Sequence, residues 1–168
     1  MNSSSSAKAS QYMQDEASFQ ARDPNYRERA HASFSRQQFM QLLGAFLVEL
    51  HPGYCEIHLQ YREELSQQHG FFHGGVIGTM ADNAGGYAAY TLLAADTSIL
   101  TVEYKLNLLA PGDGGLLIAR GYVVKAGRTL TVCRSDIVVM KQTSEQLCAT
   151  ALVTLMTLTG KPDRAVTR

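Results

Sequence analysis

The segment from Val76 to Leu93 limits the possible folds of this chain more than any other part of the sequence. It is apolar on nearly every side, and Asp82 is its only charged residue. A helix without a polar face has to be buried over most of its surface. Glycine costs about 1 kcal/mol relative to alanine inside a helix. The abundance of small residues here therefore predicts a helix that a sheet approaches closely: Gly78, Ala81, Ala84, Gly85, Gly86, Ala88 and Ala89.

Six other segments have the composition of β-strands, which favour Val, Leu, Ile and Thr. In one of them, Cys55, Ile57 and Leu59 alternate with polar residues, which is typical of a strand with one buried face. The expected strands are 45–50, 54–61, 97–109, 116–125, 129–140 and 146–158. We therefore predict an α+β fold in which one antiparallel sheet of about five to six strands wraps around one long central helix. Apolar edges left open by such a sheet favour pairing with a second copy.

A shorter helix is expected before the first strand, with Ser35 as its N-cap and Gly44 as its stop. Phe39, Leu42 and Leu43 would lie on one side of it. The 168 residues, 45% of them hydrophobic, suit a single domain with a core. We expect a flexible or partly helical N-terminal segment over 1–30, the folded domain over 31–160 and a C-terminal tail over 161–168.

Composition and motifs exclude several classes of function. The formal net charge is +0 and no basic stripe stands out, which argues against nucleic-acid binding. No charge-free run reaches the roughly 18 residues that span a bilayer, so no membrane insertion is expected. Three scattered cysteines and a start without a signal-peptide pattern indicate a reduced, cytoplasmic protein. The glycine-rich phosphate loops of nucleotide-binding proteins are absent.

Asp82 is the strongest candidate for chemistry. A carboxylate among apolar residues is costly unless it is paired or hydrogen-bonded, and desolvation raises its pKa. Such a group is suited to act as a base or nucleophile. The alternative is an aspartate on a locally exposed patch, with Asn83 beside it facing water.

The pair Gly74-Gly75 stands at the expected start of the long helix. Backbone N–H groups there lack intrahelical acceptors and could hold a carbonyl oxygen as negative charge develops on it. A flexible entry to the helix is the other explanation of two glycines. His69 and His73 are four residues apart, but their segment is broken by glycines and no further ligands cluster there, so no metal site is expected.

The stretch QQHGFFHGGVIGTMADN (67–83), followed by TVEYKLNLLAP (101–111), resembles the PaaI-like, phenylacetate-pathway branch of the hotdog-fold acyl-CoA thioesterases. The resemblance extends over about Phe39 to Thr159. It implies the hotdog fold, in which two subunits pair their sheets edge to edge and dimers commonly pair again into tetramers. It also implies an active site between subunits, where Asp82 of one chain faces the Gly74 loop of the other.

The resemblance assigns catalytic roles to particular positions. Asp82 matches the catalytic carboxylate, acting as general base or as nucleophile. Gly74 and Gly75 match the loop whose amide polarises the thioester carbonyl, and His73 matches the histidine that supports this loop. Thr101 matches a Ser or Thr that helps to place the attacking water.

Other positions are implied to bind substrate or stand apart from the family pattern. Gln67 replaces an asparagine that is frequent in relatives, which leaves its positioning role in doubt. Gly127 and Arg128 match the turn along which the nucleotide end of coenzyme A lies. An acyl chain is expected to contact apolar residues, among them Phe71, Phe72 and Met80.

The function expected from these observations is hydrolysis of an acyl-CoA to free acid and coenzyme A, by a homodimer or homotetramer. No cofactor is needed, since coenzyme A is part of the substrate. Fold alone does not decide function, and two alternatives stay open. One is a non-catalytic acyl-CoA-binding or sensing protein. The other is a hotdog dehydratase that uses His73 together with Asp82.

Overall fold

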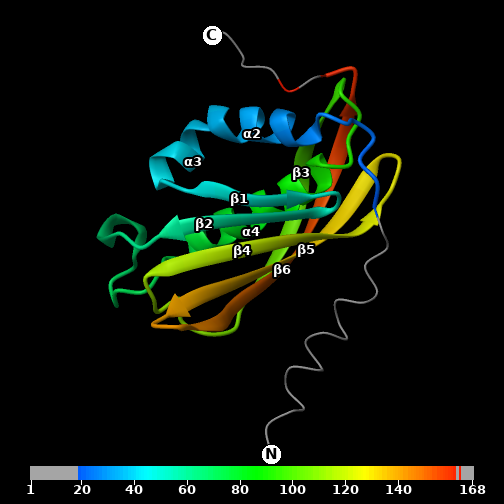
Figure 1. The fold of residues 1–168 in the computed structure, drawn as a ribbon. Helices are drawn as coiled ribbons and strands as arrows, with labels where there is room; N and C mark the ends of the chain where they lie inside the picture. The colour runs from blue at the N-terminus through cyan, green and yellow to red at the C-terminus, as the bar shows by residue number, and fades with distance from the viewer. Residues whose placement is uncertain (1–18, 162, 164–168) are drawn as a thin grey trace, which may run out of the picture.

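The computed structural model describes residues 19–161 and 163. Six antiparallel strands form one sheet in the order β1-β2-β4-β5-β6-β3 (Figure 1). The long helix α4 (Gly74–Tyr90) lies against this sheet, so the predicted α+β hotdog class is confirmed. The strands are β1 (Phe46–His51), β2 (Tyr54–Gln60), β3 (Thr97–Leu108), β4 (Leu116–Ala126), β5 (Leu130–Lys141) and β6 (Ser144–Thr159).

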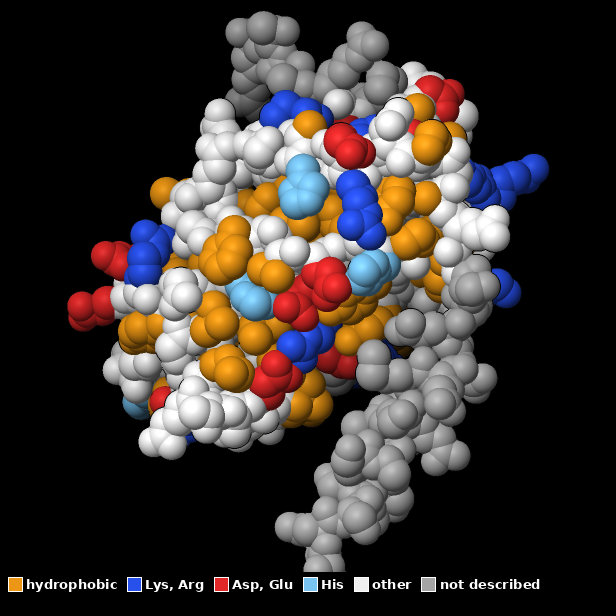
Figure 2. All heavy atoms as spheres, in the orientation of Figure 1, with side chains coloured by type: hydrophobic (Ala, Val, Ile, Leu, Met, Phe, Trp, Pro, Cys, Tyr) orange, Lys and Arg blue, Asp and Glu red, His pale blue; other side chains and the backbone are white. Residues whose placement is uncertain are grey.

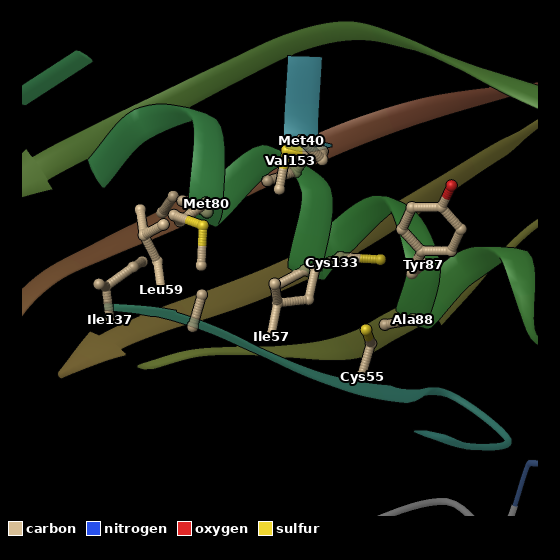
Figure 3. Packing of buried hydrophobic residues seen from close by; sticks show 14 of the residues in the cluster. Met40, Cys55, Ile57, Leu59, Met80, Tyr87, Ala88, Cys133, Ile137 and Val153 are labelled. Carbon is tan, nitrogen blue, oxygen red and sulfur yellow. The ribbon is translucent and has the colours of Figure 1, made fainter. Parts of the chain in front are cut away.

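The core lies between α4 and the face of the sheet that curls around it (Figure 3). Cys55, Ile57 and Leu59 are essentially inaccessible, as their alternation predicts. They meet the buried side of α4, where Met80 and Ala88 are equally inaccessible. Figure 3 shows these side chains converging from the helix and the strands.

Small residues let α4 and the sheet come into backbone contact. A Cβ atom added at Gly121 of β4 would lie 2.1 Å from the carbonyl oxygen of Ala84. On the helix, a Cβ at Gly85 would meet Ser135 and Val153 of β5 and β6 at 3.1–3.2 Å. The Ser135 hydroxyl donates to the Ala81 carbonyl at 2.7 Å. The close approach predicted from the small residues is therefore present.

Two short helices precede the sheet, α2 (Tyr26–Arg36) and α3 (Gln38–Leu43), and the prediction for this region was partly wrong. Ser35 is not an N-cap; it lies inside α2, because the chain becomes extended only at Gln37. Gly44 does end α3, with a left-handed φ of 76°.

The residues that α3 buries also differ from those expected to lie together on one side. Leu43 and Met40 are buried, whereas Phe39 and Leu42 are 56% and 72% exposed. Helix α2 runs through the boundary expected between residues 30 and 31, and Ala30 is fully buried in the core. The described part of the N-terminal segment therefore packs on the domain, where α2 contacts α4 and β1.

The outer face of the sheet is polar at its centre. Arg120 of β4 bonds to Glu56 of β2 and to Glu145 of β6, each at 2.7 Å, and His58 lies 2.6 Å from Glu56. Figure 2 shows acidic, basic and histidine side chains gathered among hydrophobic ones near the centre of the face in view. None of the predicted site residues belongs to this network. Among the described residues, no helix combines the length and the hydropathy needed to cross a membrane.

Candidate active site

Asp82 lies on the side of α4 that faces the edge strand β3. It is half-buried and lines a cleft of about 600 Å³ between α2, α4 and β3. The Thr101 hydroxyl donates a hydrogen bond of 2.7 Å to Oδ1 of Asp82. Burial raises the pKa of Asp82, and the Thr101 hydrogen bond offsets only part of that rise. The carboxyl therefore lies in a cleft and has one donor, rather than on an exposed patch.

A β-bulge in β3 determines which of its side chains face the helix. The register with β6 shifts between Thr101 and Glu103. Before the bulge, Ile99 and Thr101 face α4; after it, Tyr104 and Leu106 do, and both lie against Gly78. A bulge re-aims the side chains that follow it. Gly78 and Asp82 thus share the helix face toward β3, as their spacing predicts.

In the first turn of α4, the amides of Gly74 and Gly75 differ in their hydrogen bonding. Nδ1 of His73 accepts a hydrogen bond of 2.9 Å from the Gly75 N–H, which makes His73 the N-cap. The Gly75 amide is therefore occupied by the chain itself. Within residues 19–161 and 163, the Gly74 N–H has no recorded acceptor. Of the two predicted amides, only that of Gly74 is free to bind a ligand oxygen.

Gly74 lines a second hollow of about 440 Å³, at the opposite end of the helix from the α2 contacts. Gln67, Phe71 and Phe72 line the same hollow, so the structure brings these predicted residues together. The side-chain oxygen of Gln67 accepts from the backbone N–H of His69 and so closes its own loop. Phe72 is 2% exposed and packs edge-on against Tyr61.

Asp82 and the Gly74 amide do not meet within one chain. Eight residues separate them on α4, which corresponds to about 12 Å along the helix axis. A nucleophile and an oxyanion donor have to lie within about 3 Å of a reacting carbonyl group. His73 is still further from Asp82, so the pair required for a dehydratase does not form within one chain either.

Three predicted binding residues lie elsewhere. Met80 is fully buried and points from α4 into the core toward Leu59 (Figure 3), because two residues turn a helix by about 200° and place it opposite Asp82. Gly127 and Arg128 are exposed at the turn between β4 and β5, where the Gly127 N–H donates to Leu130. Neither residue lines one of the two hollows.

The sequence analysis missed the other end of the Asp82 cleft. Its lining there is polar and comes from α2 and α4: Ser33, Arg36, Gln37, Tyr87 and Tyr90. Tyr87 and Tyr90 follow Asn83 at helical spacing, so periodicity could have identified them. The α2 residues carry no such signal, because their contact with α4 depends on the tertiary packing. In the described part of the chain, no three His, Cys, Asp or Glu side chains are placed so that they could hold a metal ion.

A central helix held in a curled antiparallel sheet is the architecture of the hotdog fold. The chain belongs to the thioesterase superfamily, which it matches over residues 69–146. It is 42% identical to a thioesterase family protein from Silicibacter pomeroyi, covering 80% of this chain and 99% of that one with a TM-score of 0.79.

Two further relatives fit this assignment. The 1,4-dihydroxy-2-naphthoyl-CoA hydrolase of Listeria monocytogenes is 26% identical over 64% of this chain and 86% of its own length. The PaaI protein of the E. coli phenylacetic acid degradation operon has the same fold, with a TM-score of 0.73 at 21% identity over 82% of this chain and 96% of that one. The predicted PaaI-like hotdog resemblance is confirmed, and the chain is a thioester hydrolase.

Proposed function

We propose that this thioesterase hydrolyses acyl-coenzyme A, with Asp82 as its central catalytic residue. The observation that carries the proposal is the half-buried Asp82 carboxyl, with its raised pKa and its Thr101 donor, in a cleft large enough for an acyl group. The Listeria relative, a 1,4-dihydroxy-2-naphthoyl-CoA hydrolase, supports the substrate class. Coenzyme A enters as part of the substrate, so the reaction requires no separate cofactor.

In the general-base form of the reaction, the Asp82 carboxylate takes a proton from water as the water oxygen attacks the thioester carbon. The carbonyl oxygen becomes negative and accepts the Gly74 N–H, which the helix N-terminus makes electropositive. When the C–S bond breaks, the thiolate of coenzyme A leaves and takes up a proton. In the nucleophilic form, Asp82 attacks the carbon directly and water then cleaves the resulting anhydride.

The separation of Asp82 from Gly74 indicates that the site is completed by a second copy of the chain. Strand β3 ends the sheet and leaves an open edge with exposed apolar residues, Leu100, Val102, Tyr104 and Leu108. Antiparallel pairing of two β3 edges places the Thr101 half of one strand beside the Leu108 half of the other. Leu108 lines the Gly74 hollow. Asp82 of one subunit would then face Gly74 of its partner.

The remaining predicted residues have binding or structural roles in this proposal. Phe71 and Phe72 contribute apolar surface at the Gly74 hollow, and His73 holds the first turn of α4 in place. Gln67 positions the loop through its bond to His69. Gly127 and Arg128, at an exposed turn, offer a cation to the phosphates of coenzyme A. Met80 acts through the core alone.

The test is thiol release from a panel of aromatic and aliphatic acyl-CoAs by the wild type and by Asp82→Asn and Asp82→Ala. We expect kcat to fall at least a hundredfold in both variants, because the carboxylate is lost while the helix is kept. The Asp82→Asn variant should also unfold at a higher temperature at pH 7, since it removes a carboxylate that burial disfavours. Full activity in either variant would remove Asp82 from the mechanism.

The same panel separates the alternative functions. An acyl-CoA sensor would bind the thioesters without releasing thiol, and a dehydratase would convert a hydroxyacyl thioester to an enoyl product. The dehydratase has less support than hydrolysis, because Nδ1 of His73 is already engaged by the Gly75 N–H as the N-cap of α4.

A further inference from the structure

The Asp82 cleft has a second polar end, made by α2 and α4. A pocket for a plain hydrocarbon chain is lined mainly by apolar side chains. Here the lining at this end includes two tyrosines, a serine, a glutamine and an arginine: Tyr87, Tyr90, Ser33, Gln37 and Arg36. None of these residues has a part in the hydrolysis proposed above, so their polarity has to serve another purpose.

The hydrogen bonds at this end all run in one direction. The Gln37 amide donates to the Tyr87 hydroxyl at 2.9 Å, and that hydroxyl lies 3.0 Å from Oγ of Ser33. Ser33 has one hydrogen, and it goes to a carboxylate oxygen of Asp163. Since a carboxylate can only accept, Tyr87 is the donor to Ser33. Three hydrogens are thus aligned toward one anionic oxygen.

A carboxylate of the chain itself occupies this place. Oδ2 of Asp163, beyond the end of β6, is the acceptor from Ser33, and Nη2 of Arg36 lies 3.1 Å from the same oxygen. The Arg36 and Asp163 side chains are 40% and 32% exposed, so solvent weakens this ion pair. A carboxylate brought by a ligand can therefore displace Asp163.

Another donor at this end is unused. The Tyr90 hydroxyl is buried and lines the same cleft. Within the described residues it makes no well-aligned hydrogen bond, although Ser33 and Arg29 lie close enough to stabilise its ionised form. A buried hydroxyl without a partner is costly. The second oxygen of a bound carboxylate would satisfy it, which the Asp163 side chain does not do.

Helix geometry gives the span between the two ends of the cleft. Tyr87 and Tyr90 follow Asp82 by five and eight residues, or about 7.5 and 12 Å along α4. An extended acyl chain of about eight carbons covers such a distance. We propose that Ser33, Arg36, Tyr87 and Tyr90 form a carboxylate subsite, and that the enzyme takes medium-length acyl thioesters with a carboxylate at the far end. This inference rests on the proposed acyl-CoA hydrolysis.

The experiment compares kcat/KM for octanedioyl-CoA and octanoyl-CoA in matched variants. The ratio of the two values is the readout, because it is insensitive to a partial loss of folded enzyme. Asp163→Ala should raise the ratio at least threefold by removing the internal competitor. Arg36→Met, which keeps an unbranched stem but removes the guanidinium group, should lower it at least tenfold. Arg27→Met is the control on the outer side of α2 and should leave the ratio unchanged.

The outcomes separate the two proposals. If neither thioester releases thiol, the proposed function itself fails. If octanoyl-CoA is hydrolysed but the Asp163→Ala variant does not favour octanedioyl-CoA, only the carboxylate subsite is wrong, and Asp163 and Arg36 form a surface ion pair. A ratio that is equal in the Arg36→Met variant and the wild type would also overturn the subsite.

Discussion

Asp82 combines two properties that oppose each other at the scale of a single residue. Its burial on α4 raises its pKa and so makes it a stronger base than an exposed aspartate. The same burial makes its ionised form less stable in the folded protein. A hydrogen bond from Thr101 reduces this conflict by stabilising the carboxylate. In the proposed mechanism, the Thr101 hydroxyl therefore adjusts the pH range in which Asp82 can act as a base.

Replacing Thr101 by valine should move the acidic limb of the pH profile to higher pH. In the proposed mechanism Asp82 acts in its deprotonated form, so activity is lost as the pH falls through its pKa. Without the donor the carboxylate is less stable and its pKa rises further. A hydrogen bond to a charged group contributes about 1.5–3 kcal/mol, which corresponds to a shift of about one pH unit or more.

The measurement is the pH dependence of kcat/KM for the wild type, Thr101→Val and Thr101→Ser. Serine keeps the hydroxyl, so the acidic limb of the Thr101→Ser profile should stay near the pH of the wild-type limb. A limb that stays unchanged in the valine variant would show that Thr101 does not act through Asp82.

At the scale of elements, the contact of α4 with β4 is limited by backbone atoms rather than by side chains. Gly121 lies so close to the Ala84 carbonyl that a Cβ there would overlap with it. Side chains can change rotamer to relieve such overlap, but two backbones in regular structure cannot. The helix and the strand would have to move apart, together with the side chains packed around them.

Gly121→Ala should therefore lower the free energy of unfolding by about 3 kcal/mol, at the upper end of the usual cost of overpacking. Urea denaturation followed by circular dichroism measures this change. Gly115→Ala, at the start of β4, is the matched control, because a Cβ there would meet nothing within 4 Å. Equal stabilities of the two variants would contradict the close approach on which the fold depends.

At the scale of the whole molecule, the proposed dimer follows from the distance between the two halves of the machinery. Asp82 lines one hollow and the Gly74 amide lines another. If each site takes its carboxylate from one subunit and its amide from the partner, two differently inactivated subunits should complement each other. Such complementation would not occur if each chain held a complete site.

Mixing Asp82→Asn with Gly74→Pro subunits tests this arrangement. Proline removes the N–H but suits the first position of a helix, and His73 has the extended conformation that precedes proline. Each variant alone should be nearly inactive. After unfolding and refolding together in equal amounts, half of the dimers would be mixed with one intact site each, which restores about a quarter of wild-type activity. No recovery in confirmed mixed dimers would contradict a shared site.

The sequence by itself determined the central helix, the strands and the close approach between them, and it made Asp82 the candidate catalytic residue. These depend on local periodicity and on residue size, which can be read along the chain. It was wrong about Ser35, because where α2 ends depends on packing against α4. Only the tertiary structure decided that Thr101 faces Asp82, because β3 and α4 are brought together only by the folded chain.

The tertiary structure also decided that His73 occupies the Gly75 amide and leaves Gly74 free, that Met80 points into the core, and that α2 supplies the polar end of the cleft. Each of these depends on the three-dimensional course of the backbone, to which residues distant in sequence contribute together. Residue spacing along one segment cannot encode such contacts.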